Sequence, residues 1–183
     1  QGIGQGIITK ISPESIELKV ENISPKYFAP FELLVGLSRP PTCKKLLEHG
    51  TSLGVSRFNF YPAQLSEKSY QESNLFKDYQ KYLKYGLSQS GIYHQMPEVN
   101  LKKDFSGEQK FVLSPKTKKT FLDYKIQPNK KITLAIGPER GFLNREIDAF
   151  KDQGFLEVSI GPPILRVEIA TFAALGQLHL LLV

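Results

Sequence analysis

The chain has 183 residues, enough for one ordinary domain with a fragment or for two small domains. Its hydrophobic share of 40% and charged share of 23% are typical of globular proteins, which argues against the disordered and membrane classes. A formal charge of +6 favours a polyanionic partner such as a nucleic acid.

The single cysteine, Cys43, excludes an internal disulfide, and no cysteine and histidine cluster has metal-ligand spacing. We therefore expect no metal and a reducing, cytoplasmic compartment. The longest apolar stretch, 172–183, is shorter than the roughly 20 residues of a spanning helix, so we expect no membrane partner. Because residue 1 is Gln1 and the only methionine is Met96, we expect the chain to begin partway through a longer gene product.

The first predicted element is a hairpin over residues 6–23. Two runs rich in β-branched residues flank the turn Ser12-Pro13-Glu14-Ser15, a pattern typical of antiparallel strands. Because a lone hairpin is marginal in water, we expect it to belong to a small β domain whose other strands precede Gln1, or to pack on the main domain. Residues 24–30 contain two prolines and are predicted to be a linker.

Strands and helices alternate after the linker, which indicates βα units around a mostly parallel sheet. We predict strands at 31–37, 57–61, 110–113, 132–136 and 158–160, and helices from 40, over 75–90, from about 144 and over 168–182. The aromatic residues within 75–90 recur at three- and four-residue intervals and are interpreted as core. The predicted fold class is therefore α/β with a parallel sheet.

Two loops carry the strongest functional signal, because each follows a predicted strand and contains a Gly-Pro pair. They are IGPERGF at 136–142 and IGPPILR at 160–166. Ligands of open α/β sheets bind outside the carboxyl ends of the strands, where glycine allows close approach of the backbone and proline stiffens the loop. Each loop alone has an ordinary strand-to-helix turn as its alternative. Their paired occurrence favours a ligand site.

The segments IGPERGFLNREI and SIGPPILRVEIA resemble the two signature loops of RsmE-like ribosomal RNA uridine N3-methyltransferases of the SPOUT superfamily, which read IGPEGGFSxxE and LGxRILRxETA. Three further segments, at 37–40, 51–55 and 87–97, occur in the same order as in that family. The similarity spans residues 31–180, and five ordered matches argue against coincidence. The hairpin at 6–23 is similar to the last part of the PUA-like β domain that precedes the catalytic domain in that family.

This resemblance implies a SPOUT-type sheet with a C-terminal trefoil knot, a feature that sequence physics alone would not propose. It divides the chain into a remnant of an N-terminal PUA-like β domain at 1–23, a linker at 24–30 and a knotted methyltransferase domain at 31–183. It also implies S-adenosyl-L-methionine as cofactor and a homodimer. The implied reaction is methylation of uridine N3 in 16S ribosomal RNA of the small subunit.

Uracil N3 carries a proton, so methyl transfer needs that proton removed or the resulting anion stabilised by a cation. Arg166 matches the second arginine of RILR and is predicted to orient the uracil or its phosphate, with an ion pair to Glu168 as the alternative. Glu139 matches the motif glutamate and is the second catalytic candidate, with a loop brace as the alternative. By the same resemblance, the cofactor-binding candidates are Ile136, Gly137, Gly141, Ile160, Gly161 and Leu165.

Several signature positions differ in this chain. Arg140 replaces the second glycine of PEGG, Pro163 the first arginine of RILR and Ile169 the threonine of ETA. Proline removes a guanidinium and a backbone donor, and arginine needs room that glycine does not. Leu143 stands where the helix-capping serine is expected, so Asn144 is predicted to take over the cap. The alternative to an active enzyme is a catalytically impaired knotted module for RNA binding or assembly.

Overall fold

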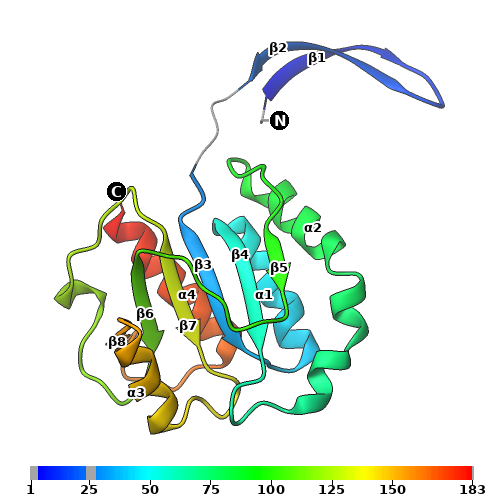
Figure 1. The fold of residues 1–183 in the computed structure, drawn as a ribbon. Helices are drawn as coiled ribbons and strands as arrows, with labels where there is room; N and C mark the ends of the chain where they lie inside the picture. The colour runs from blue at the N-terminus through cyan, green and yellow to red at the C-terminus, as the bar shows by residue number, and fades with distance from the viewer. Residues whose placement is uncertain (1–3, 24–27, 183) are drawn as a thin grey trace.

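The computed structural model describes residues 4–23 and 28–182 (Figure 1). A hairpin is followed by a six-stranded sheet with the order β5-β4-β3-β7-β6-β8, in which every neighbouring pair is parallel. The strands are β3 (Phe31–Gly36), β4 (Val55–Tyr61), β5 (Glu98–Asn100), β6 (Gln109–Leu113), β7 (Ile132–Ile136) and β8 (Leu156–Val158). The helices are α1 (Pro40–Ser52), α2 (Gln80–Ser90), α3 (Asn144–Asp152) and α4 (Val167–Leu181). The predicted α/β class with a parallel sheet is confirmed.

Helices cover both faces of this sheet. Leu33 and Val35 of β3 pack into a core with residues of α1, α2 and α4, while the intervening Leu34 packs into a second core with α3. Alternate residues of a strand point to opposite faces, so a strand buried on both sides is apolar almost throughout. Each large side chain buried in this way contributes about 1.5–3 kcal/mol of transfer free energy.

Three sequence predictions need correction. The helix expected over 75–90 begins only at Gln80, because Ser73 caps a short 3-10 turn (Asn74–Lys77) that ends at Asp78 with φ −135°. The last strand is Leu156–Val158 rather than 158–160, because Ser159 donates its amide to Lys119 O instead of to the sheet. The short edge strand β5 was not predicted.

The hairpin expected over 6–23 is confirmed as β1 (Gly4–Ile11) and β2 (Ile16–Ile23). All of its strand residues are exposed, including Ile11 of β1 and Ile16 of β2. Residues 24–27 of the predicted linker lie outside the described residues. Pro30, also assigned to the linker, is buried and accepts a hydrogen bond from Ile132 N at 2.8 Å, so it packs with the sheet.

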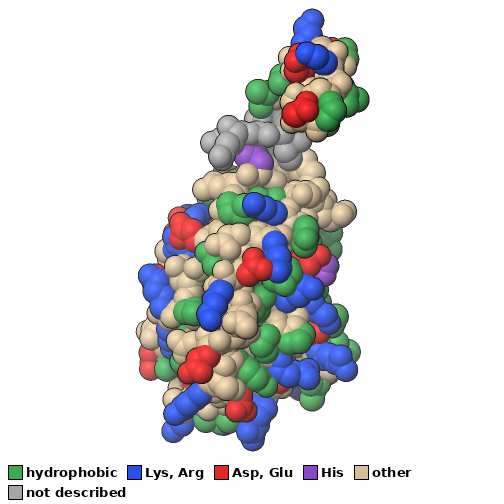
Figure 2. All heavy atoms as spheres, turned by 90° about the vertical axis from the view of Figure 1, so that its right-hand side faces the viewer, with side chains coloured by type: hydrophobic (Ala, Val, Ile, Leu, Met, Phe, Trp, Pro, Cys, Tyr) green, Lys and Arg blue, Asp and Glu red, His purple; other side chains and the backbone are tan. Residues whose placement is uncertain are grey.

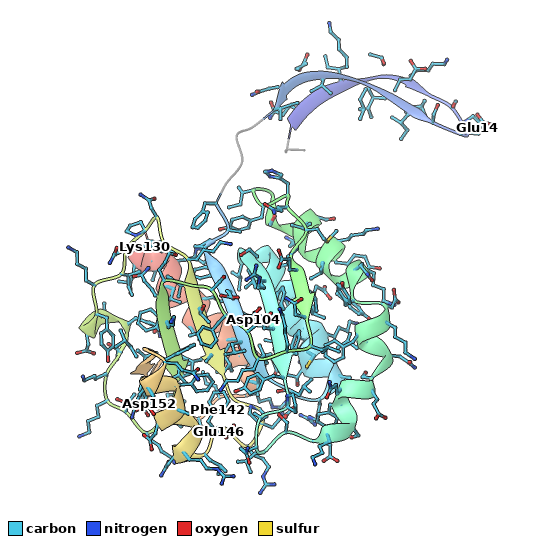
Figure 3. The ribbon with its side chains drawn as sticks, in the orientation of Figure 1. Glu14, Asp104, Lys130, Phe142, Glu146 and Asp152 are labelled. Atoms are coloured by element: carbon cyan, nitrogen blue, oxygen red, sulfur yellow. The ribbon has the colours of Figure 1, made fainter. Side chains whose placement is uncertain are left out.

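A buried carboxylate fixes the segment that joins β5 to β6. This segment crosses the face of the sheet that α3 covers, as the position of Asp104 in Figure 3 shows. Glu32 of β3 is 1% exposed, and its Oε2 accepts hydrogen bonds from Ser106 N (2.7 Å), Gly107 N (3.1 Å) and Thr133 Oγ1 (2.8 Å). Its Oε1 accepts from Asn59 Nδ2 at 3.0 Å. A polar network satisfied in this way specifies one position for the crossing segment.

The side of the molecule that carries α2 has a mixed surface. Figure 2 shows lysine and arginine side chains interspersed there with acidic and hydrophobic ones. Within the described residues, no helix is long and apolar enough to cross a membrane. The same residues contain no cluster of three or more His, Cys, Asp or Glu side chains that could hold a metal ion.

Candidate functional site

A cavity of about 590 Å³ lies at the carboxyl ends of β6, β7 and β8. Its walls come from the loops after these three strands and from the first turns of α3 and α4. Figure 3 shows Phe142, which lines the cavity, at this edge of the sheet. Since β3 and β7 are neighbours whose connections leave in opposite directions, the cavity lies beside the point where a doubly wound sheet binds ligands.

The loop after β7 is held in a tight turn. Gly141 has φ +73° and donates its amide to Pro138 O at 2.7 Å. A Cβ added to Gly137 would lie 2.9 Å from the Cα and carbonyl carbon of Gly141, so only glycine lets the two ends of this turn approach so closely. The turn brings its backbone to the cavity wall.

The loop after β8 depends on the left-handed backbone of Gly161, which has φ +135°. Ser159 Oγ donates to Gly161 O at 3.2 Å, and Gln177 of α4 donates to Ile160 O at 3.1 Å. Pro163 follows at the open side of the cavity. The loop is therefore anchored at its start, and Gly161, Pro163 and Leu165 line the cavity.

All six residues predicted to bind the cofactor line this cavity: Ile136, Gly137, Gly141, Ile160, Gly161 and Leu165. Glu139 also lines it, and its Oε1 accepts the backbone amide of Arg39 at 2.8 Å. This contact ties the loop after β7 to the start of α1, as expected if Glu139 braces the loop. Arg166 is exposed at the first residue before α4 and does not line the cavity. The catalytic roles of Glu139 and Arg166 stay predictions.

The ion pair predicted as the alternative for Arg166 is not formed. Glu168 of α4 instead accepts from Lys45 Nζ of α1 at 2.9 Å. Burial pushes the pKa of Glu168 upward, but the hydrogen bond from Lys45 and the positive charge nearby outweigh it and leave the pKa below its ordinary value. This pair fixes the first turn of α4 against α1.

Replacing Lys45 with methionine is expected to make the protein more sensitive to acid. A lowered folded-state pKa gives stability that is present above the unfolded pKa of Glu168 and is lost as pH falls through the folded value. Without Lys45, burial of the carboxyl is opposed only by its backbone hydrogen bond and by Arg166, so the folded pKa of Glu168 rises and the loss begins at higher pH. Circular dichroism across an acid titration measures the midpoint. Lys84→Met, on the exposed face of α2, is the control, and equal midpoints for the two variants would contradict the prediction.

The departures from the family pattern leave the cavity open. Arg140 is exposed at its rim, and Pro163 Cδ is 3.7 Å from where a Cβ on Gly161 would lie, an ordinary contact. Ile169 is 48% exposed and does not line the cavity. At the start of α3, the backbone amide of Leu143 is accepted by Glu146 at 2.9 Å. The prediction that Asn144 takes over the cap is wrong, because Asn144 is the first residue of the helix.

Sequence reasoning missed one wall of the cavity, the loop after β6. Ser114, Pro115 and Lys116 line it, and Lys116 Nζ donates to Asn144 Oδ1 at 2.6 Å. A sequence signal for this wall was available, because a small residue followed by proline occurs after each of the three strands, at Ser114-Pro115, Gly137-Pro138 and Gly161-Pro162. The lysines downstream of Pro115 obscured it. Leu65, from the loop after β4, was also missed and carried no comparable signal.

Residues 25–179 match the model of a family described as the RNA methyltransferase domain. The chain belongs to this family. Ribosomal RNA small subunit methyltransferase E 1 of Borreliella burgdorferi is 30% identical to this chain over 78% of the chain and 63% of the relative. Ribosomal RNA small subunit methyltransferase E of Treponema pallidum is also 30% identical, over 79% of the chain and 60% of the relative. The chain thus spans about 60% of the length of these relatives.

The fold of this family member also has solved counterparts. A ribosomal RNA small subunit methyltransferase E from Neisseria gonorrhoeae, crystallised with S-adenosyl methionine, superposes with a TM-score of 0.79. The comparison covers 98% of this chain and 80% of that one at 21% identity, so it shows a common fold.

Proposed function

We propose that the chain is the catalytic part of a ribosomal RNA methyltransferase that uses S-adenosyl-L-methionine to methylate uridine N3 in 16S ribosomal RNA. The observation that carries the proposal is the cavity at the ends of β6, β7 and β8, lined by both signature loops in a member of the RNA methyltransferase family. The names of the two curated relatives specify small-subunit ribosomal RNA, which supports this substrate. An impaired module, the alternative, gains no support from a cavity that stays open.

The residues present fit this cofactor. The volume of about 590 Å³ falls within the usual range of roughly 300–1,000 Å³ for small-molecule sites. Leu113, Ile136 and Ile160 give apolar walls for a purine, while the backbone of Gly137 and Gly161 lines the cavity. When bound, S-adenosyl-L-methionine supplies the methyl group.

The protein's own contribution is to position the uracil and to favour its N3 anion. Arg166 is exposed next to Leu165 of the cavity wall, so its guanidinium is free to turn towards a base at the mouth of the cavity. A cation there lowers the energy of the developing anion. Glu139 holds the loop after β7 in place through Arg39 N, and we propose that it acts by this positioning.

Calorimetric titration with S-adenosyl-L-methionine and with its demethylated product tests the cofactor site, and transfer of a labelled methyl group to intact small ribosomal subunits tests the reaction. The label is expected in N3-methyluridine. A folded chain that binds neither compound would overturn the proposal. Salt-sensitive RNA binding without transfer would favour the impaired module instead.

Arg166→Gln is expected to lower the rate constant of methyl transfer about 100-fold while leaving the cofactor dissociation constant and the melting temperature unchanged. The reason is that this exposed side chain lies outside the cavity wall but beside its mouth. Arg166→Lys keeps the cation and should recover part of the rate. Single-turnover kinetics with saturating cofactor measure the rate constants of both variants. A wild-type rate constant in Arg166→Gln would exclude the catalytic role of Arg166.

We further propose the knotted topology and the domain division at 1–23, 24–30 and 31–183. Support for the knot comes from Ser159 N, which donates to Lys119 O at 2.7 Å, so the chain leaving β8 lies against the loop after β6 before α4 returns to the other face. The exposed apolar residues of β1 and β2 support a remnant of a larger PUA-like β domain, because a lone hairpin is marginally stable.

A homodimer and a cytoplasmic location complete the proposal. α4 exposes Ile169 (48%) and Leu180 (79%), and the loop before it exposes Ile164 (88%), which gives an apolar surface for a second copy. Light scattering on the purified chain tests the dimer. Burial raises the pKa of the Cys43 thiol to about 12, as expected for an inert thiol in a reducing compartment.

A further inference from the structure

A second hollow, of about 540 Å³, lies at the carboxyl end of β4. It shares the first turns of α3 with the cofactor cavity, since Asn144 and Ile147 line that cavity while Arg145 and Glu146 line the hollow. Glu146 is seen at this lower edge of the sheet in Figure 3. The hollow is lined by Tyr61, Pro62, Gln64, Lys103, Arg145, Glu146 and Ala149.

Tyr61 is the unusual member of this set. The residue is 6% exposed, and its hydroxyl is buried without a hydrogen-bond partner among the described residues. Burial, and secondarily the charge of Glu146, raise the pKa of Tyr61, so the hydroxyl remains a proton donor at neutral pH. Buried polar groups are nearly always paired, and phenylalanine would pack here without this cost. The hydroxyl therefore indicates a partner from outside the described chain.

Two cations line the same hollow as Tyr61. Lys103 is exposed, and its ammonium lies 5.6 Å from the ring centroid of Tyr61 and 4.5 Å from that of Phe150. Arg145 donates from Nη2 to Gln64 Oε1 at 2.7 Å, which holds its guanidinium at the hollow. Neither cation forms an ion pair with a carboxylate within residues 4–23 and 28–182.

The nearby carboxylate is already engaged. Glu146 accepts the backbone amide of Gln64 at one oxygen (3.0 Å) and that of Leu143 at the other (2.9 Å). These bonds turn it towards the backbone at the start of α3. The hollow thus offers two cations that form no ion pair among the described residues and one neutral donor, beside one carboxylate whose oxygens accept backbone amides.

We propose that this hollow binds a phosphodiester of the RNA strand, next to the nucleotide held at the cofactor cavity. The inference rests on the proposed function. A phosphate carries several acceptor oxygens, which suits a guanidinium, an ammonium and a hydroxyl together, and backbone contacts of this kind set the register of a strand. Lys103 lies over the Tyr61 ring, so its ammonium and the unpartnered hydroxyl belong to neighbouring side chains of the same hollow.

The test uses the full chain and a fluorescein-labelled oligouridylate, with affinity measured by fluorescence anisotropy at several salt concentrations. Tyr61→Phe is expected to weaken RNA binding roughly threefold to tenfold without lowering the melting temperature, because it removes only the unpaired hydroxyl. The double variant Lys103→Gln, Arg145→Gln is expected to reduce the slope of log affinity against log salt by about 0.7 per lost contact. The matched control is Lys77→Gln, Lys84→Gln, which removes the same charge from two exposed lysines, one in the 3-10 turn before α2 and one in α2.

Wild-type affinity in Tyr61→Phe, or a double variant no weaker than its control, would overturn the inference. Inorganic phosphate separates the two sources of the anion: if it binds wild type and not Tyr61→Phe while RNA affinity is equal in both, the site takes free phosphate and the RNA assignment is wrong. Cofactor affinity is measured on the same samples. If the wild type binds RNA but no cofactor, the proposed function fails. The RNA affinities of the variants still show whether this hollow binds a phosphodiester.

Discussion

Replacing Gly137 with alanine is expected to weaken S-adenosyl-L-methionine binding at least about tenfold, equivalent to 1.4 kcal/mol or more. The added Cβ would lie 2.9 Å from backbone atoms of Gly141, closer than real Cβ atoms approach, and backbone cannot move aside as a flexible side chain can. The turn after β7 must open, and it forms one wall of the cavity. Calorimetric titration of the variant measures the loss.

Gly154→Ala is the matched control for this prediction. Gly154 lies in the tight turn after α3 with φ +83°, but a Cβ there meets no atom within 4 Å and the residue does not line the cavity. The control should cost about 1 kcal/mol of stability through backbone strain and leave cofactor affinity unchanged. If both variants lose the same affinity, global destabilisation is the cause and the close approach of Gly137 to Gly141 is not.

Replacing Glu32 with alanine is expected to lower the free energy of unfolding by about 3–5 kcal/mol. The carboxylate is 1% exposed, and its removal leaves the amide of Ser106 and the side chain of Asn59 without their acceptor, while the amide of Gly107 keeps only Thr133 Oγ1. For a chain of this size the loss corresponds to a fall in melting temperature of roughly 10 °C. Urea and thermal unfolding measure it.

A second readout locates the damage. Amide exchange of Ser106 and Gly107 should accelerate more than that of β7, because Glu32 is what fixes the segment crossing the sheet. Glu14→Ala, in the exposed turn of the hairpin, is the control and should leave both stability and exchange unchanged. A stability close to wild type in Glu32→Ala would show that the network contributes little.

The fold was largely predictable, because most of its helices and strands are long enough to show a regular spacing of apolar residues. Strand β7 was predicted with its observed bounds, and the nearly continuous apolar run of β3 matches its burial between two helix layers. The prediction failed where a local bond overrode the pattern. At 75–79, the Ser73 cap and the φ of Asp78 end the turn early, and at 159 an amide leaves the sheet for Lys119.

The site was predictable in part. The Gly-Pro loops identified six residues that all line the cavity, because backbone next to a strand end must face the ligand edge of the sheet. Arg166 was chosen by motif alone, and the structure places it outside the cavity wall. Its expected partner Glu168 binds Lys45, a residue 123 positions earlier in the chain, and no sequence pattern reports such a pairing.

The α/β class, the order of most elements and the two loops at the ligand edge could be predicted from the sequence, because they depend on residues close together in the chain. The position of β7 between β3 and β6, the open cavity beside Arg140 and Pro163, and the unpaired hydroxyl of Tyr61 became visible only in the folded chain. These facts depend on which distant segments pack together. That packing is settled by the shape and burial of whole side chains, which local sequence does not encode.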